Sequence, residues 1–102
     1  MTQFKLVSEP RADLDIEAAF QWYEKERAGL GIEFLDELRE VYAKIVDGPF
    51  QYSQLRSNIR RALLKRFPSA VFFSVENETI VALAVLHTAR DPAEWQRRGR
   101  QS

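Results

Sequence analysis

The sequence IRRALLKRFPSAVFFSVENETIVALAVLHTARDPAEW spans residues 59–95 and joins a cationic segment to two apolar runs. The tight pair Asn77-Glu78 separates Ala70–Val75 from Thr79–Leu86, and this spacing predicts two adjacent antiparallel strands. The segment before them is expected to form a further strand that carries four cations, Arg60, Arg61, Lys65 and Arg66. Cations that are held on a sheet lose little entropy on binding, so the pattern favours phosphate or an acidic partner.

The N-terminal half predicts one strand and two helices. Phe4–Val7 alternates as a short strand does. A first helix is expected from an N-cap at Asp13 to a stop at Gly29, with Ile16, Ala19, Phe20 and Tyr23 on one apolar face. A second helix is expected from about Ile32 to the stop signal at residues 47–49, with Phe34, Leu38, Val41, Tyr42 and Ile45 on its apolar face. The chain therefore predicts an α+β fold of order β-α-α-β-β-β, with a helical hairpin packed on a small, mainly antiparallel sheet.

Length and composition indicate a single domain over residues 1–102. Residues from about 96 to 102 are expected to fray, because no apolar residue follows Trp95. The absence of Cys and the single His make a metal site unexpected, and no cofactor is predicted. The N-terminus lacks the pattern of a secretion signal, and the longest apolar run is too short for a bilayer. We therefore expect a cytoplasmic protein without a membrane partner.

The zero net charge conceals an asymmetry along the chain. Residues 1–54 contain 6 Lys and Arg against 11 Asp and Glu, whereas residues 55–102 contain 9 against 4. The two halves therefore carry charges of −5 and +5. Acidic helix surfaces are common in ordinary proteins, but cations at this density on a strand usually protect an edge or bind a partner.

Several features occur together in one order: two amphipathic helices ending in Gly-Pro, the Arg60-Arg61 pair, Phe67-Pro68 before an apolar strand, an acidic turn, VALAVLH and RDPAEW. This combination resembles the RelE/ParE superfamily of toxins from bacterial type II toxin-antitoxin systems. The ending from His87 to Pro92, followed by Trp95, is similar to the ParE, or plasmid-stabilisation, branch. The resemblance implies a toxin that inhibits DNA gyrase. It also implies a cognate ParD-like antitoxin from the adjacent gene and a toxin-antitoxin hetero-oligomer.

Two other functions are compatible with the same sequence. The RelE-like branch implies cleavage of messenger RNA in the ribosome, which requires acid/base groups and cations around a phosphorane. The residues for that chemistry are His87, Arg60, Arg61 and Arg90, but the tyrosine common near the last strand of RelE-like enzymes has no counterpart here. The catalytic residues therefore stay unassigned. The second alternative is a binding module of the same fold without toxicity.

Six residues are predicted to bind the target or the antitoxin: Arg60, Arg61, Lys65, Arg66, His87 and Arg90. Strand alternation predicts that Arg60 and Arg66 share one face while Arg61 and Lys65 share the other. One of these pairs is expected either to contact a partner or to bond glutamates of the helical hairpin. His87 has a purely structural alternative, a hydrogen bond to backbone or to Asp91.

The residues after His87 also have a structural interpretation. Asp91 can cap a short terminal helix that has Pro92 at its first position, and Trp95 can fold this helix back onto the core. Arg90 would then project beside His87 at the rim of the sheet.

Overall fold

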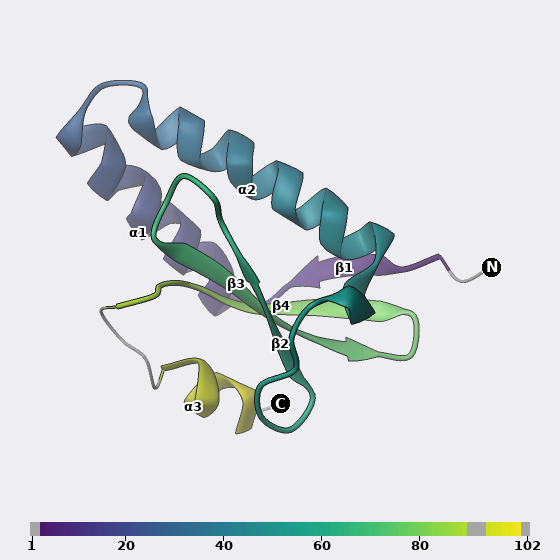
Figure 1. The fold of residues 1–102 in the computed structure, drawn as a ribbon. Helices are drawn as coiled ribbons and strands as arrows, with labels where there is room; N and C mark the ends of the chain where they lie inside the picture. Colours follow the sequence, from purple (N-terminus) through teal and green to yellow (C-terminus); the bar gives the residue numbers. More distant parts are fainter. Residues whose placement is uncertain (1–2, 90–93, 101–102) are drawn as a thin grey trace.

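The computed structural model describes residues 3–89 and 94–100. In chain order its elements are β1 (Lys5–Ser8), α1 (Pro10–Glu26), α2 (Leu30–Asp47), the 3-10 helix η1 (Pro49–Gln51), β2 (Ile59–Leu63), β3 (Ser69–Glu76), β4 (Thr79–His87) and α3 (Glu94–Arg100). The helical hairpin of α1 and α2 lies on one side of the sheet and α3 lies on the other (Figure 1). This arrangement confirms the predicted β-α-α-β-β-β order, and α3 is a short terminal helix of the kind that the residues after His87 indicate.

The four strands form one sheet in the order β1-β4-β3-β2. The β1–β4 pair is parallel, and the other two pairs are antiparallel. The turn between β3 and β4 is at Asn77-Glu78 as predicted, and Asn77 adopts a left-handed φ of 60°. A register shift leaves Leu83 without a partner on β3, because Phe72 pairs with Ala84 and Phe73 with Ala82. Because of this bulge, the side chains of Val85 and His87 lie on the face of the sheet that the helical hairpin covers.

The helices begin earlier than the sequence indicates. The prediction of Asp13 as N-cap is wrong: α1 starts at Pro10, whose fixed φ suits the first turn of a helix. Asp13 instead accepts a hydrogen bond of 2.8 Å from the Ser8 hydroxyl. The second helix starts at Leu30 and not near Ile32.

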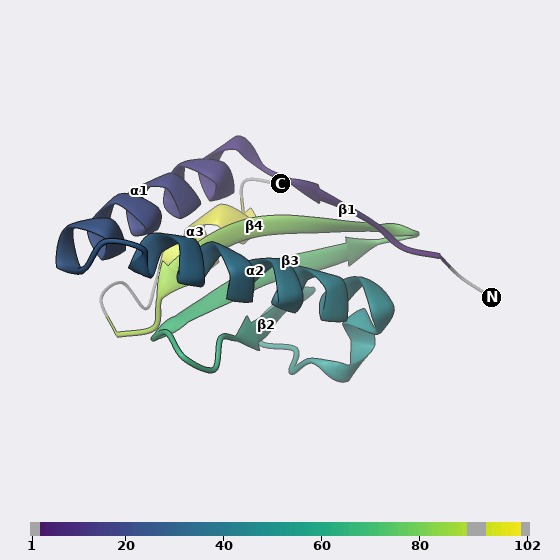
Figure 2. The same cartoon turned by 90° about the horizontal axis from the view of Figure 1, so that it is seen from above.

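A side chain of α1 stabilises the early start of α2. The carboxylate of Glu24 accepts the backbone N–H groups of Gly29 at 3.1 Å and Gly31 at 2.8 Å. These bonds satisfy donors that the first turn of a helix leaves open. The two helices cross the sheet as an antiparallel pair, as the view from above shows (Figure 2).

Two apolar layers cover the two faces of the sheet. The larger lies under the helical hairpin and includes Phe34, Leu38, Phe73 and Ile80, all buried. The smaller lies on the opposite face and includes Ile59, Phe72 and Leu83, with Trp95 packed against it. Adjacent phenylalanines 72 and 73 therefore serve different layers, because successive side chains of a strand alternate.

The expectation that residues from about 96 onward fray is wrong for the described part of this segment, because α3 extends over Glu94–Arg100. Trp95 stacks on Phe72 with ring centroids 5.6 Å apart and planes at 2°, so the predicted return of Trp95 to the core is confirmed. Arg98 is the second anchor, since its side chain is only 10% exposed. Charge therefore holds this helix in addition to the apolar anchor Trp95 that the sequence indicates.

Candidate functional site

The turn between β2 and β3 and the end of β4 meet at one end of the sheet. Ser69 pairs with His87, and the Leu64 N–H donates to the Ser69 carbonyl at 2.9 Å. The Thr88 N–H also donates to the Pro68 carbonyl at 2.9 Å. We call residues 64–69 and 87–89 the sheet end. This contact brings Lys65 and Arg66 to the same end of the molecule as His87, although they are about twenty positions apart in sequence.

Arg60 holds a loop in place. Its guanidinium donates to the Tyr52 carbonyl at 2.7 Å and lies 5.1 Å from the centroid of the Phe50 ring. It also reaches the Gln54 side chain at 3.4 Å. Arg60 thus fixes the segment between η1 and β2, and its guanidinium N–H groups are used mainly in these contacts.

The predicted alternation of four cations along one strand is wrong, because β2 ends at Leu63. The strand ends at this point because the buried Glu37 of α2 binds the backbone of the residues that follow it. Its carboxylate accepts the backbone N–H groups of Lys65 and Arg66, the latter at 3.1 Å. Charge-assisted bonds of this kind are stronger than neutral ones, so they compete well with further strand pairing.

Arg66 confirms the expectation that a cation bonds glutamates of the hairpin. Its guanidinium lies 3.4 Å from Glu37 and 3.7 Å from Glu33. Arg61 and Lys65 differ from it: both side chains are exposed, and neither forms an ion pair within the described residues. Arg61 and Lys65 are therefore the predicted cations with charge available to a partner.

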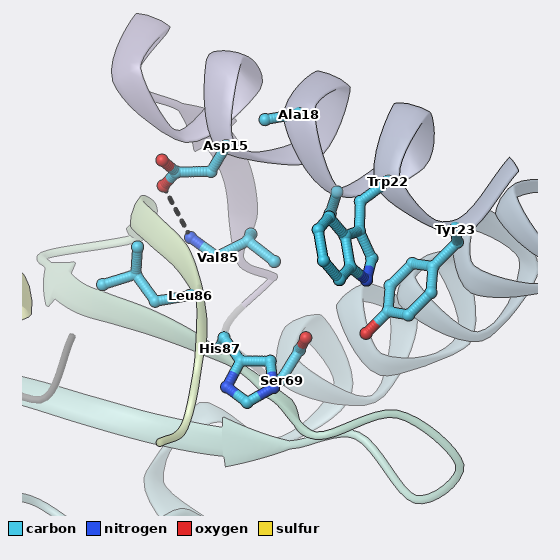
Figure 3. Close-up of a pocket in the computed structure, with 9 residues that line it drawn as sticks. Asp15, Ala18, Trp22, Tyr23, Ser69, Val85, Leu86 and His87 are labelled. Atoms are coloured by element: carbon cyan, nitrogen blue, oxygen red, sulfur yellow. Dashed lines mark hydrogen bonds between the residues drawn. The ribbon is translucent and has the colours of Figure 1, made fainter. Parts of the chain in front are cut away.

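His87 lines a pocket of about 370 Å³ between α1 and the end of β4. Trp22 and Tyr23 lie on the α1 side, and Ser69 and His87 lie on the sheet side (Figure 3). The remaining lining is formed by Asp15, Ala18, Ala19, Val85 and Leu86. The small alanine side chains leave the hollow that the aromatic rings border. Apolar contact and a few hydrogen-bonding groups are what this pocket offers a ligand.

The hydrogen bonds of His87 define what its ring can donate. The backbone N–H of Ala89 donates to Nδ1 at 3.2 Å, which confirms the predicted bond to backbone. A neutral imidazole that accepts at Nδ1 carries its proton at Nε2. His87 can therefore donate one hydrogen bond from Nε2 to a bound group.

Tyr23 belongs to the pocket in addition to the core, and sequence reasoning missed this second role. Its ring packs 4.8 Å from Phe67 and 5.2 Å from Phe34, as its position on the apolar helix face predicts. The same ring reaches the wall opposite His87 (Figure 3). Helical periodicity places a residue on a face, but it does not show which strand end that face meets.

Asp15 forms part of one wall of the pocket, and both oxygens of its carboxylate accept hydrogen bonds. It accepts the Val85 N–H at 3.0 Å and forms two hydrogen bonds with the guanidinium of Arg98, one of them at 3.0 Å. The hydrogen bonds with Asp15 raise the pKa of Arg98 above its ordinary value. Nothing in the sequence connects positions 15 and 98, so this pair was missed as well.

The predictions for Arg90, Asp91 and Pro92 lie outside the described residues. Within residues 3–89 and 94–100, no group of three His, Cys, Asp or Glu side chains is placed to hold a metal ion. In the same part of the chain, no helix combines the length and apolar character that crossing a membrane requires.

Comparison with known proteins defines the class to which this fold belongs. The model of the ParE toxin of the type II toxin-antitoxin system, parDE, matches residues 6–92. The chain therefore belongs to the ParE toxin family. A solved structure described as the chromosomal ParDE TA system from P. aeruginosa superimposes with a TM-score of 0.74 at 18% identity, covering 83% of this chain and 96% of that one. No curated protein matches the chain.

Proposed function

We propose that this chain is a toxin that inhibits DNA gyrase in the cytoplasm and is neutralised by a ParD-like antitoxin in a hetero-oligomer. The observation that carries the proposal is the match to the ParE toxin family over residues 6–92. The exposed cations Arg61 and Lys65 support it, because an enzyme that holds DNA presents acidic and phosphate groups to a partner.

The pocket of His87 also supports a binding function. A ribonuclease needs cations close to its acid/base group, since charge develops on the phosphorane. The described residues that line this pocket contribute one carboxylate and no Lys or Arg. That carboxylate, on Asp15, is already occupied by Val85 and Arg98. The described part of the lining suits a neutral or apolar group of a protein better than a phosphate.

A second candidate is a ribosome-dependent endoribonuclease of the RelE type. It is favoured by one observation, the presence of Tyr23 in the same pocket as His87. These two side chains offer a hydroxyl and an imidazole to one ligand, which is the combination that acid/base chemistry uses. The sequence assigns the cations of this alternative to Arg60, Arg61 and Arg90, but Arg60 and Arg61 do not line the pocket of His87.

Two assays on one purified preparation separate the candidates. A gyrase poison inhibits supercoiling or traps cleaved DNA, and it leaves messenger intact on translating ribosomes. The variant His87→Gln should keep most of this inhibition, because the glutamine amide can still donate a hydrogen bond to a bound group and binding needs no acid/base step. Codon-positioned cuts that His87→Gln reduces by about 10²-fold or more would establish the nuclease instead. Thr88→Ala is the matched control, since Thr88 neighbours His87 but its hydroxyl only donates to the Pro68 carbonyl.

A further inference from the structure

The strand β1 forms one edge of the sheet, and the outer side of its backbone is open. It pairs with β4 alone and runs along the outer margin of the sheet (Figure 2). The N–H groups of Lys5 and Glu9 donate to backbone carbonyls of the β3–β4 hairpin, each at 2.9 Å. By alternation, the backbone groups of Leu6 and Ser8 point outward. Among residues 3–89 and 94–100, these outward N–H and carbonyl groups have no hydrogen-bond partner.

The side chains of β1 divide between the two faces of the sheet. Leu6 packs against the core under the helical hairpin. Lys5 and Val7 therefore lie on the opposite face, and Glu9 joins them because its extended backbone continues the ladder with β4. Lys5, Val7 and Glu9 are exposed, and neither charged side chain forms an ion pair within the described part of the chain. This edge thus presents a cation, an apolar side chain and an anion in a row.

A second copy of the chain is a partner that fits this edge. Two copies of one edge strand meet in antiparallel orientation around a two-fold axis. Only outward-pointing residues exchange backbone hydrogen bonds, so the pair can be centred on Lys5, Leu6 or Val7. A centre at Ser8 is excluded because Leu6 would then face Pro10, which has no N–H.

The charges on the edge distinguish these three registers. A pair centred on Lys5 sets the two lysines directly opposite each other, which is unfavourable. A pair centred on Leu6 sets Lys5 opposite Val7 and leaves the cation without a counter-charge. A pair centred on Val7 sets Lys5 of each copy opposite Glu9 of the other, so an ion pair lies on either side of a contact between the two valines. In this register Leu6 and Ser8 of opposite copies also exchange both of their backbone hydrogen bonds.

Exposed apolar side chains lie near both ends of β1. Phe4 packs edge-on against Phe50 with ring centroids 5.8 Å apart, and Phe50 is 61% exposed. Leu14 is 68% exposed and follows Pro10 by one helical turn. In the register centred on Val7, Phe4 of one copy lies opposite Pro10 of the other. The second copy therefore brings apolar surface to each end of the strand pair.

We infer that two copies of this chain pair through β1 in antiparallel orientation, with Lys5 of each copy opposite Glu9 of the other. The two four-stranded sheets then form one continuous sheet, in which β1 is no longer an edge. The pocket of His87 stays outside the junction, because β1 reaches β4 only up to Ala82 and the pocket begins at Val85 on that strand. The dimer thus presents two such pockets. This inference goes beyond the proposed function, since it concerns the toxin alone.

Charge reversal tests the register. In Lys5→Glu the new carboxylate faces Glu9 of the other copy at both ends of the junction, so the dimer should be at least about tenfold weaker. Glu9→Lys should weaken it to a similar extent, because two cations then face each other. An equimolar mixture of the two variants should dimerise again, since each chain meets opposite charges on the other. The matched control is Lys25→Glu, which changes the net charge equally at an exposed position near the end of α1 and should leave the dimer intact.

Sedimentation of the full chain from micromolar to millimolar concentration measures these affinities. Hydrogen exchange at single amides then locates the junction. Where the dimer predominates, the Leu6 amide should exchange at least about tenfold more slowly than in dilute toxin, because its outward N–H gains a partner. The Leu63 amide is the comparison: it points outward from β2 at the other edge, since the next N–H, of Leu64, donates inward to Ser69. Its exchange should stay unchanged.

Each outcome decides for or against the inference. Dimerisation of the unmodified toxin, loss in both single variants and recovery in their mixture support it, together with protection of Leu6. A toxin that stays monomeric over the whole concentration range overturns it. A dimer that protects Leu63 in place of Leu6, or variants that the mixture does not restore, overturn it as well. Thermal unfolding of each variant checks its fold, and the double variant Lys5→Glu with Glu9→Lys, which restores opposite charges within one chain, should dimerise as the unmodified toxin does.

Discussion

Arg98 of α3 and Asp15 of α1 lie 83 positions apart and form an ion pair whose side chains are only 10% and 13% exposed. The pair covers the edge of β4 beyond the last residue that β1 reaches. β1 pairs with β4 only up to Ala82, and Asp15 then accepts the Val85 N–H. Arg98 also reaches the Leu83 carbonyl at 3.4 Å. Two side chains thus complete the hydrogen bonding where the neighbouring strand ends.

Removal of the cation from this pair should destabilise the protein. Arg98→Ala leaves Asp15 buried without its counter-charge, and we expect a loss of about 3 kcal/mol in the free energy of unfolding. Urea unfolding measures this loss. Arg39→Ala is the matched control, because its pair with Asp36 is 77% and 61% exposed and should contribute less than about 1 kcal/mol. Equal effects of the two variants would show that the Asp15 pair is not an anchor.

The docking of α3 should weaken in acid. Hydrogen bonds from Arg97 and Arg98 lower the pKa of Glu94 below its ordinary value of 4.5. A carboxyl group with a lowered folded pKa stabilises the fold fully above the unfolded pKa, and this contribution is lost as the pH falls through the folded value. Glu94→Gln should therefore be less stable than the unmodified protein at pH 6, and the difference should shrink below about pH 4.5.

Fluorescence of Trp95 reports the acid effect. In a Trp22→Phe background, Trp95 is the remaining tryptophan and stacks on Phe72. Acidification should shift its emission toward that of a solvated indole before the sheet unfolds. A change of the same size and midpoint in Glu94→Gln would exclude Glu94 as its source.

Tyr42 should respond to alkali. Its hydroxyl is buried and forms no hydrogen bond of ordinary geometry among the described residues, because the nearby Ser8 hydroxyl donates to Asp13. Burial is the main cause that raises its pKa to about 12, and the proximity of Ser8 opposes this rise. A group with a raised folded pKa contributes stability below its unfolded pKa, near 10, and loses it as the pH rises through the folded value. Stability should thus fall between about pH 10 and 12. Tyr42→Phe should lose less stability over this range.

The same substitution has a clear expectation at neutral pH. Tyr42→Phe removes an unsatisfied polar group, so the free energy of unfolding should stay the same or rise by about 1 kcal/mol. Thermal unfolding at pH 7 measures this change. A loss of more than about 1 kcal/mol would mean that the hydroxyl has a partner in solution.

Close contact between the two long helices should make Gly31 intolerant of a side chain. A Cβ at this position would lie 2.7 Å from Cδ1 of Phe20 and 2.8 Å from the Phe20 carbonyl oxygen. Gly31→Ala should cost about 1 to 3 kcal/mol, because the helices must separate. Gly29→Ala is the comparison: its φ of 91° is strained for alanine, but no atom lies within 4 Å of the new Cβ. A cost near 1 kcal/mol is expected there, without a change in helix packing.

The order of elements and the composition of the main core could be predicted from sequence alone. Apolar spacing located both helices, and the Asn77-Glu78 turn located the β3–β4 hairpin. Phe34 and Leu38 are buried as their spacing indicates. These features are local, since helix and strand periods depend on residues only a few positions apart.

The partner of each charged side chain was determined by tertiary structure. Strand alternation predicted two faces for the four cations, yet Glu37 of α2 ends β2 and binds the backbone of Lys65 and Arg66. The burial of Arg98 with Asp15 and the meeting of Tyr23 with His87 likewise join distant parts of the chain. A charge or hydrogen bond acts on whatever the fold brings near, and sequence spacing carries no information about that neighbour. The sequence by itself therefore determined which side chains are available, and the packing of α1, α2 and α3 on the sheet determined which of them remain free to bind.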